Sequence, residues 1–295
     1  MALQVAAAEA RRGHVTFANQ IRELIDKKPK QPLRLISVSP ELADLLIERE
    51  PATNYASLVV DPEIERRVAR IVAEFHQADK LARHGMQNRR KILLTGPPGT
   101  GKTMTASILA RQTRIPFFVV QIDRLFTRYL GETNAKLRQV FAVIRERPGV
   151  YLFDEFDALA SSRGSDNDVG EMRRVLNALL QFIEEDDSQS LIVAATNSIE
   201  SIDSALFRRF DDIIHYQLPG SKEIEGVIRN RLATFYAGFG FDPVVSAARG
   251  LSHAEIVEAC NDTIKDAILG DQSKITQKAL VEMLRERKAA YHTAK

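Results

Sequence analysis

The chain contains one cysteine, a nearly balanced charge and no long apolar run, and each shortage excludes a class of protein. Cys260 has no second cysteine with which to form an intramolecular disulfide. The 41 basic and 39 acidic residues give a net charge of +2, which provides no long-range field to attract a polyanion. Apolar runs such as Leu191–Ala195 fall far short of the roughly 20 residues that span a bilayer.

The sequence also lacks the patterns of a secretory signal and of a metal site. No basic segment precedes the apolar N-terminal residues, and Glu9 interrupts them. The six histidines are scattered without the spacing of metal ligands. Cys260 lies in a helical pattern and fits a small buried apolar residue better than a nucleophile. These absences predict a cytoplasmic protein that does not contact a membrane.

Short apolar runs alternate with helical stretches from residue 91 onward. The runs are Ile92–Thr95, Phe117–Gln121, Val150–Phe153 and Leu191–Thr196, with Ile213–Leu218 as a fifth candidate. Strands that alternate with helices favour a parallel sheet, and uniformly apolar strands indicate that both faces of the sheet are covered. The predicted fold class is therefore α/β.

Helical patterns dominate the two ends of the chain. We expect a helix over residues 1–26, a short helix from Glu41 to Glu48, and a third helix after Asp61 and Pro62, with Asp61 as its N-cap. Residues 221–295 contain helical patterns only. The predicted division is a helical N-terminal segment over 1–57, an α/β core over 58–220 and a small helical domain over 221–295.

A phosphate-binding pattern follows the first strand of the core. It consists of Gly96, Pro97, Pro98, Gly99, Thr100, Gly101, Lys102 and Thr103 and matches G-x-x-x-x-G-K-[ST] in full. Glycines allow successive backbone N–H groups to surround phosphate oxygens, and the following helix adds its positive end. Lys102 is expected to reach the β- and γ-phosphates of a nucleotide, and the Thr103 hydroxyl to bind Mg²⁺.

Polar residues at two later strand ends complete a candidate catalytic group. Asp154 is expected to hold Mg²⁺, and the adjacent Glu155 to polarise the attacking water. Asn197 ends another strand, where its carboxamide can orient that water or sense the γ-phosphate. The alternatives are a pair of acidic residues capping the next helix and an Asn that starts a turn.

Two adjacent arginines, Arg208 and Arg209, follow in a segment of mixed apolar pattern. A guanidinium group suits stabilisation of a transferring phosphoryl group, whereas a pair of structural salt bridges is the alternative interpretation.

These motifs, in this order, resemble the AAA family of the AAA+ ATPases over roughly residues 58–270. The resemblance implies a P-loop NTPase core, with a Walker A motif at 96–103, a Walker B motif ending at Asp154–Glu155 and a sensor residue at Asn197. It further implies that ATP and Mg²⁺ bind between neighbouring subunits of a homo-oligomeric ring, usually a hexamer. Arg208 and Arg209 would act as arginine fingers on the next subunit, and their adjacency leaves open which of the two does so.

The resemblance also implies a helical lid that starts near residue 221. The segment 250–256 is similar to a family pattern in which a small residue, here Ala254, approaches the adenine. The segment 163–168 stands where a second pore loop would fall, but it is acidic and lacks an evident gripping residue.

A candidate substrate-binding loop contains Tyr129, Leu130 and Gly131. It resembles the aromatic–hydrophobic–glycine loop with which protein-remodelling AAA motors grip an extended peptide. An aromatic side chain packs against any peptide side chain, and Gly131 allows the loop to move. Tyr129 can alternatively be an ordinary core or interface aromatic residue. A nucleic-acid motor would more naturally present several lysines and arginines there.

The leading hypothesis is therefore an ATP-driven motor that threads a protein substrate through the central pore of a ring. A protease or adaptor partner, and either substrate docking or packing by residues 1–57, are further expectations from the resemblance. Two alternatives remain: a nucleic-acid-associated ATPase of the loader or transposition-helper type, which the charge balance disfavours, and a scaffold that assembles on ATP.

Overall fold

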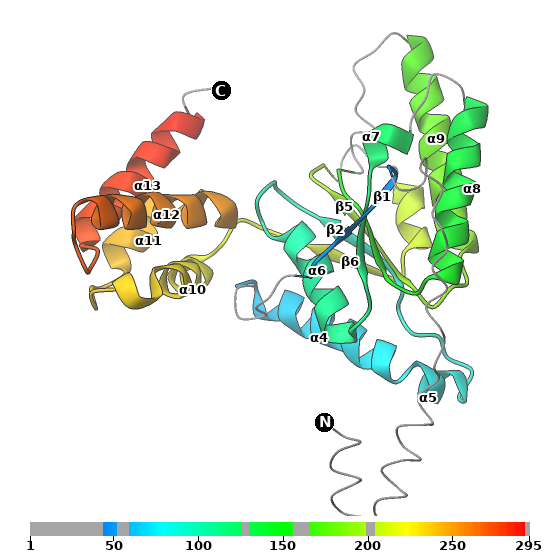
Figure 1. Cartoon of the computed structure of the whole chain (residues 1–295), viewed down its shortest axis with the longest axis horizontal. Coiled ribbons are helices and arrows are strands. Elements are labelled where there is room, and N and C mark those ends of the chain that lie inside the picture. The colour runs from blue at the N-terminus through cyan, green and yellow to red at the C-terminus, as the bar shows by residue number, and fades with distance from the viewer. Residues whose placement is uncertain (1–43, 52–58, 126–129, 156–165, 199–203, 293–295) are drawn as a thin grey trace, which may run out of the picture. The chain divides into compact units, whose positions relative to one another are not determined.

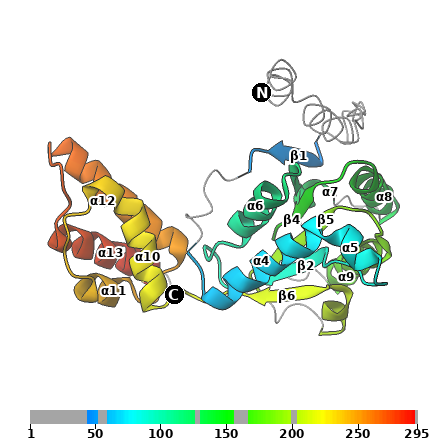
Figure 2. The same cartoon turned by 90° about the horizontal axis from the view of Figure 1, so that it is seen from below.

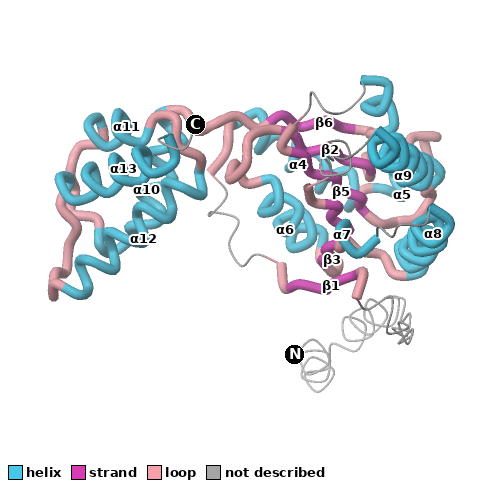
Figure 3. The backbone as a smooth tube through the Cα atoms, turned by 90° about the horizontal axis from the view of Figure 1, so that it is seen from above, coloured by secondary structure: helices cyan, strands magenta, loops and turns pink. Residues whose placement is uncertain are grey.

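A six-stranded sheet forms the centre of the structure. The computed structural model describes residues 44–51, 59–125, 130–155, 166–198 and 204–292, and all of them belong to one compact unit, Pro40–Lys295. The strand order is β1-β3-β4-β5-β2-β6. Figure 3 labels five of these strands in that order, from β1 to β6. The strands are β1 (Leu46–Arg49), β2 (Lys91–Thr95), β3 (Phe117–Val120), β4 (Val150–Phe153), β5 (Leu191–Thr196) and β6 (Asp212–His215). All neighbouring pairs are parallel except β1 and β3, which confirms the predicted α/β class.

Helices cover both faces of this sheet (Figures 1 and 3). Those on one face are α4 (Pro62–His76) and α6 (Lys102–Thr113), and those on the other are α8 (Leu130–Glu146) and α9 (Asp166–Glu185). Successive strand residues point to opposite faces, so Leu93 packs toward α8 and α9 while Ile92 and Leu94 pack toward α4 and α6. Shorter elements connect them: α5 (Ala78–Ala82), α7 (Ile122–Leu125) and the 3₁₀ helix η3 (Ser204–Arg209).

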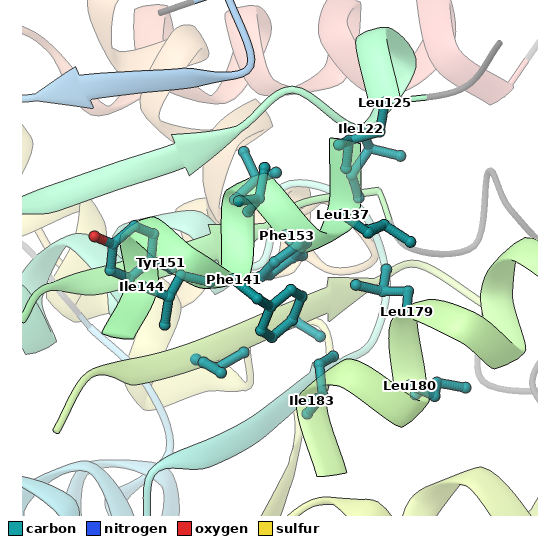
Figure 4. Packing of buried hydrophobic residues seen from close by; sticks show 14 of the residues in the cluster. Ile122, Leu125, Leu137, Phe141, Ile144, Tyr151, Phe153, Leu179, Leu180 and Ile183 are labelled. Carbon is teal, nitrogen blue, oxygen red and sulfur yellow. The ribbon is translucent and has the colours of Figure 1, made fainter. Parts of the chain in front are cut away.

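Aromatic packing fixes β4 against α8 and α9. Phe141 of α8 stacks on Phe153 of β4, with ring centroids 6.1 Å apart, and on Phe182 of α9, at 5.3 Å. Figure 4 shows Phe141 and Phe153 among aliphatic side chains that include Leu179 and Ile183. Phe141 and Phe153 are at most 1% exposed. The strand β4, which Asp154 follows directly, is therefore packed tightly against these two helices.

The predicted N-cap of α4 at Asp61 is confirmed. The Asp61 side chain accepts a hydrogen bond of 2.7 Å from the backbone N–H of Glu63, and Pro62 occupies the first helical turn. Ile64, Val68 and Ile71 form the buried stripe of the helix.

The predicted helix from Glu41 to Glu48 is wrong where the structure describes it. Leu46–Arg49 is a strand that pairs antiparallel with β3, from Leu46 opposite Val120 to Arg49 opposite Phe117. The side chains from Ile47 to Arg49 are exposed, so backbone pairing with a free sheet edge, rather than a buried helical stripe, determines the local structure. The predicted helix over 1–26 lies outside the described residues.

The described C-terminal residues form helices, as the sequence predicts, and one isolated parallel β-bridge joins Tyr236 and Ile275. The helices are α10 (Ser221–Leu232), the 3₁₀ helix η4 (Ala233–Phe235), α11 (Asp242–Ala248), α12 (His253–Leu269) and α13 (Gln277–His292), and Figure 2 shows the four α-helices packed together. They share a hydrophobic core of their own. Cys260 lies in that core, where burial raises the pKa of its thiol to about 12, so its interpretation as an inert apolar residue is confirmed. Within the described ranges, no helix is long and apolar enough to cross a membrane.

Candidate functional site

The phosphate-binding loop connects β2 to α6 through three glycines with positive φ angles. These angles are 138° at Gly96, 73° at Gly99 and 102° at Gly101. An L-residue rarely adopts such angles, so glycine is required for this path of the chain. Helix α6 then begins at Lys102 without an acidic residue in its first turn. Its positive N-terminal end is therefore available to an anion.

Gly96 offers a direct test of this loop geometry. A Cβ atom at this position would overlap the backbone carbonyl of Tyr216, which is fixed by a 2.6 Å hydrogen bond from its own N–H to the carbonyl oxygen of Thr95. We expect Gly96→Ala to lower the free energy of unfolding by about 3 kcal/mol, since backbone strain and steric overlap add. Urea unfolding measures this, with Gly240→Ala as the control because a Cβ there meets nothing within 4 Å. Equal stability of the two variants would contradict the described path.

The Lys102 ammonium group is held at the centre of the site. It is 6% exposed and donates to the carbonyl oxygens of Gly96 (2.7 Å) and Pro97 (2.9 Å) and to Oδ1 of Asn197 (2.8 Å). The structure thus brings together the loop lysine and the Asn197 carboxamide from the end of β5. Phosphate oxygens would compete with these three neutral acceptors for the same ammonium group.

The acidic end of β4 lies beside the start of α6. The Thr103 hydroxyl donates to Oδ2 of Asp154 at 2.6 Å, and the backbone N–H of Glu155 donates to Oδ1 of Asp154 at 3.0 Å. Hydroxyl and carboxylate oxygens are the donor atoms that Mg²⁺ prefers, so this pair fits a magnesium ion. Among the described residues, no group of three or more His, Cys, Asp or Glu side chains forms a further candidate metal site.

Glu155 has an unusual backbone conformation for its residue type. Its φ is 54°, in the left-handed region, and its side chain is exposed. A non-glycine residue in this region is strained, and such strain is found most often at functional sites.

The start of α12 meets the phosphate-binding loop. Ser252 and Glu255 form a reciprocal capping box that fixes the first turn of the helix. The backbone N–H of Ala254 then donates to the carbonyl oxygen of Gly99 at 3.0 Å. A Cβ on Gly99 would lie 2.7 Å from the Ser252 hydroxyl, so the close approach of the two segments requires glycine at this position.

One pocket of about 660 Å³ collects these groups. From the predicted site, its lining includes Pro98 to Thr103, Asp154, Glu155, Asn197 and Ala254. The lining residues that sequence reasoning missed are Val59, Met104, Val227, Asn230, Arg231, His253, Val257 and Glu258. They carry no motif of their own, and the fold alone brings α10, α12 and the residues before α4 to one place.

The two arginines differ in their surroundings, and neither lines this pocket. Nε of Arg209 lies 3.3 Å from Oε2 of Glu184 on α9, and its side chain is 29% exposed. Nη1 of Arg209 is buried without a hydrogen-bond partner among the described residues. Arg208 is exposed, and no ion pair links it to any residue in the described ranges. Arg208 is therefore the one that can reach another molecule without breaking a contact described in the structure.

The predicted substrate-binding loop is only partly within the described residues. Tyr129 lies outside them. Leu130 and Gly131 form the first turn of α8, so their assignment to a loop is wrong. The second pore-loop candidate over 163–168 is described only from Asp166, where α9 begins.

Comparisons with known proteins agree with this geometry. The family model described as "ATPase family associated with various cellular activities (AAA)" matches residues 92–218. An uncharacterized AAA family ATPase, y4kL, of Sinorhizobium fredii is 34% identical over 94% of this chain and 86% of its own length. The proteasome-activating nucleotidase of Archaeoglobus fulgidus is 29% identical over 87% of this chain and 69% of its own length.

Two further similarities extend the comparison. The ATP-dependent zinc metalloprotease FtsH 3 of Sphaerobacter thermophilus is 30% identical over 80% of this chain, and the match spans half of that protein. The crystal structure of the FIGL-1 AAA domain superimposes with a TM-score of 0.64 at 23% identity, covering 85% of this chain and 91% of the domain. The likeness to the FIGL-1 domain shows a common fold.

Proposed function

The chain belongs to the AAA family of ATPases, and we propose that it hydrolyses ATP as one subunit of a homo-oligomeric ring, a hexamer, that remodels a polypeptide substrate. The observation that carries the proposal is the pocket in which the phosphate-binding loop, the acidic end of β4, Asn197 and the start of α12 meet. ATP binding and hydrolysis follow from family membership. The ring, the magnesium ion and the polypeptide substrate are the proposed part.

The phosphate end of the pocket binds the triphosphate in this proposal. The backbone N–H groups of Gly99, Thr100 and Gly101 and the N-terminus of α6 surround the phosphates, and Lys102 supplies a compact positive charge. Thr103 and Asp154 would hold Mg²⁺, which would neutralise charge on the phosphate oxygens.

Proton transfer is assigned to Glu155. Its carboxylate accepts a proton from the attacking water, which Asp154 cannot do while it holds the metal ion. Asn197 contributes through the contact already present, because its Oδ1 accepts from the Lys102 ammonium group and orients it.

Completion of the site requires a neighbouring subunit in this proposal. We assign the arginine finger to Arg208, since its exposed guanidinium is free to reach the γ-phosphate bound by the next subunit. We assign an anchoring role to Arg209, which pairs with Glu184 of α9. A ring closes when each subunit presents one surface to the next, and this arrangement uses such a head-to-tail contact.

The polypeptide substrate is supported by the sequence of residues 129–131 and by the relatives. One relative is named a proteasome-activating nucleotidase and another an ATP-dependent zinc metalloprotease. By analogy we propose that this ATPase works with a protease or adaptor partner and that residues 1–57 take part in docking. The cytoplasmic location stays a prediction from the sequence.

Tyr129→Ala tests the threading proposal. We expect basal ATP turnover to stay within about twofold and processing of a labelled unfolded protein to be lost, because the aromatic group grips the chain without touching the nucleotide. Tyr129→Phe is the matched control and should retain processing, since the ring is preserved.

Intact processing by Tyr129→Ala would contradict threading by this residue. A rise in ATP turnover with DNA, weakening steeply with salt, would favour the nucleic-acid alternative.

A further inference from the structure

Tyr216 contacts both the start of the phosphate-binding loop and the helix that follows it, although it does not line the pocket. It comes directly after β6 and is 3% exposed. At the start of the loop, its backbone N–H donates to Thr95, and a Cβ on Gly96 would overlap its carbonyl group. After the loop, its phenol oxygen lies 2.6 Å from Oγ1 of Thr105 in α6. Tyr216 thus spans the loop from outside the pocket.

The two hydroxyl groups form a hydrogen-bond network with a fixed direction. Oγ1 of Thr105 donates to the carbonyl oxygen of Gly101 at 3.1 Å, and a hydroxyl has only one proton to donate. Tyr216 is therefore the donor to Thr105. Burial raises the pKa of Tyr216, so the phenol keeps the proton that it donates. The reverse direction would leave that buried proton without a partner among the described residues, which is unfavourable.

The network ends on the peptide unit at the start of α6. The carbonyl oxygen of Gly101 accepts from the backbone N–H of Thr105 at 2.9 Å as well as from its hydroxyl. This carbonyl shares a planar trans peptide unit with the N–H of Lys102, which points the opposite way. The first N–H groups of a helix point out of its N-terminus, where phosphate oxygens bind. Gly101 and Lys102 both line the pocket, so the network bears on how a phosphate is held.

Restraint matters at this peptide unit because both residues of the network's end have alternatives. Gly101 has a φ of 102°, and glycine has the widest choice of backbone conformations. A helical threonine divides between two χ1 rotamers. The bond from Tyr216 favours the rotamer in which Oγ1 of Thr105 reaches Gly101.

We propose that Tyr216 is a positioning residue for nucleotide binding: through Thr105 it holds the peptide unit between Gly101 and Lys102 in the orientation that directs the Lys102 N–H to a phosphate oxygen. The inference rests on the proposed nucleotide site. Because Tyr216 acts on the phosphate end of the pocket, its contribution does not depend on the base. It also leaves proton transfer by Glu155 unchanged.

Tyr216→Phe and Thr105→Val test the network, because each removes one hydroxyl and nearly preserves the shape of the side chain. Isothermal titration with Mg²⁺ compares ATP with tripolyphosphate, which lacks the base, in a Glu155→Gln background that prevents turnover. We expect Tyr216→Phe to weaken the binding of both ligands about threefold and Thr105→Val about fivefold. The double variant should match Thr105→Val, because no part of the network remains to be lost. With Glu155 intact, Tyr216→Phe should raise the KM for ATP about threefold and leave kcat within about twofold.

Two controls separate positioning from a general effect on stability. Tyr151→Phe removes another buried tyrosine hydroxyl, which donates to the carbonyl oxygen of Arg147 at 2.7 Å away from the pocket. It should lower the free energy of unfolding in urea as Tyr216→Phe does, but bind both ligands undiminished. Thr105→Ser retains the hydroxyl and should bind both ligands within about twofold of the unaltered background.

Three results would overturn the assignment: undiminished binding by folded Tyr216→Phe, weakening for ATP but not for tripolyphosphate, or additive effects in the double variant. If Tyr216→Phe does not fold, Thr105→Val and Thr105→Ser test the same network, and equal affinities of these two would overturn it.

The nucleotide site itself is tested separately. If Lys102→Ala binds ATP as tightly as the wild type, the proposed site fails, whatever Tyr216 does. If Lys102→Ala loses the binding of ATP and tripolyphosphate while Tyr216→Phe binds both normally, only the role of Tyr216 fails.

Discussion

Glu155→Gln is expected to lower ATP turnover by about 10²–10⁴-fold while ATP binding stays within a few-fold of the wild type. The substitution preserves the size of the side chain and the N–H contact to Asp154 but removes the carboxylate that accepts the proton from water. Steady-state phosphate release and equilibrium titration measure the two quantities. The variant should accumulate as an ATP-bound oligomer and should retain protein substrates in a pull-down.

Glu146→Gln provides the control for this result. Glu146 is an exposed carboxylate at the end of α8, outside the pocket, and its substitution should leave turnover unchanged. If Glu155→Gln loses turnover and ATP binding by the same factor, Glu155 contributes to the binding of ATP rather than to its hydrolysis.

Arg208→Ala is the second substitution with a large expected effect. Removal of an arginine finger should lower turnover by about 10³-fold or more. The free energy of unfolding should change by less than about 0.5 kcal/mol, because the exposed side chain makes no described ion pair. Phosphate release and urea unfolding measure the two effects.

Arg209→Ala is the matched comparison, and we expect it to lower stability more, and turnover less, than Arg208→Ala does. Its side chain is half-buried and pairs with Glu184, so stability should fall by about 1 kcal/mol. Turnover should fall less than in Arg208→Ala. Loss of turnover in Arg209→Ala alone would move the finger role to Arg209, and no loss in either would exclude catalysis by this pair.

Local patterns in the sequence predict much of this molecule. The sheet strands β2 to β5 are recognisable because each is a short, mainly apolar run that the fold buries on both faces. The phosphate-binding loop is readable because its glycines and Lys102 lie within eight consecutive residues. The N-cap at Asp61 depends only on the residues beside it, and it too is predictable.

Features that depend on distant parts of the chain are not predictable in this way. The strand β1 has helix-like spacing, and only the free edge of β3 makes it extended. Val59 and His253 are unremarkable in sequence, and only the fold brings them to the same pocket. The contact between Lys102 and Asn197 likewise joins residues 95 positions apart. The difference between Arg208 and Arg209 arises from Glu184, which no spacing rule connects to them.

A mixing experiment tests the central claim, that the active site is completed between subunits. Rings made only of Glu155→Gln subunits or only of Arg208→Ala subunits are expected to be inactive. In a ring that mixes the two at random, about a quarter of the interfaces join an intact Glu155 of one subunit to an intact Arg208 of the next. We predict that an equimolar mixture assembled from separated subunits regains ATP turnover at least tenfold above either variant alone. Turnover no higher than the average of the two variants would contradict a shared site.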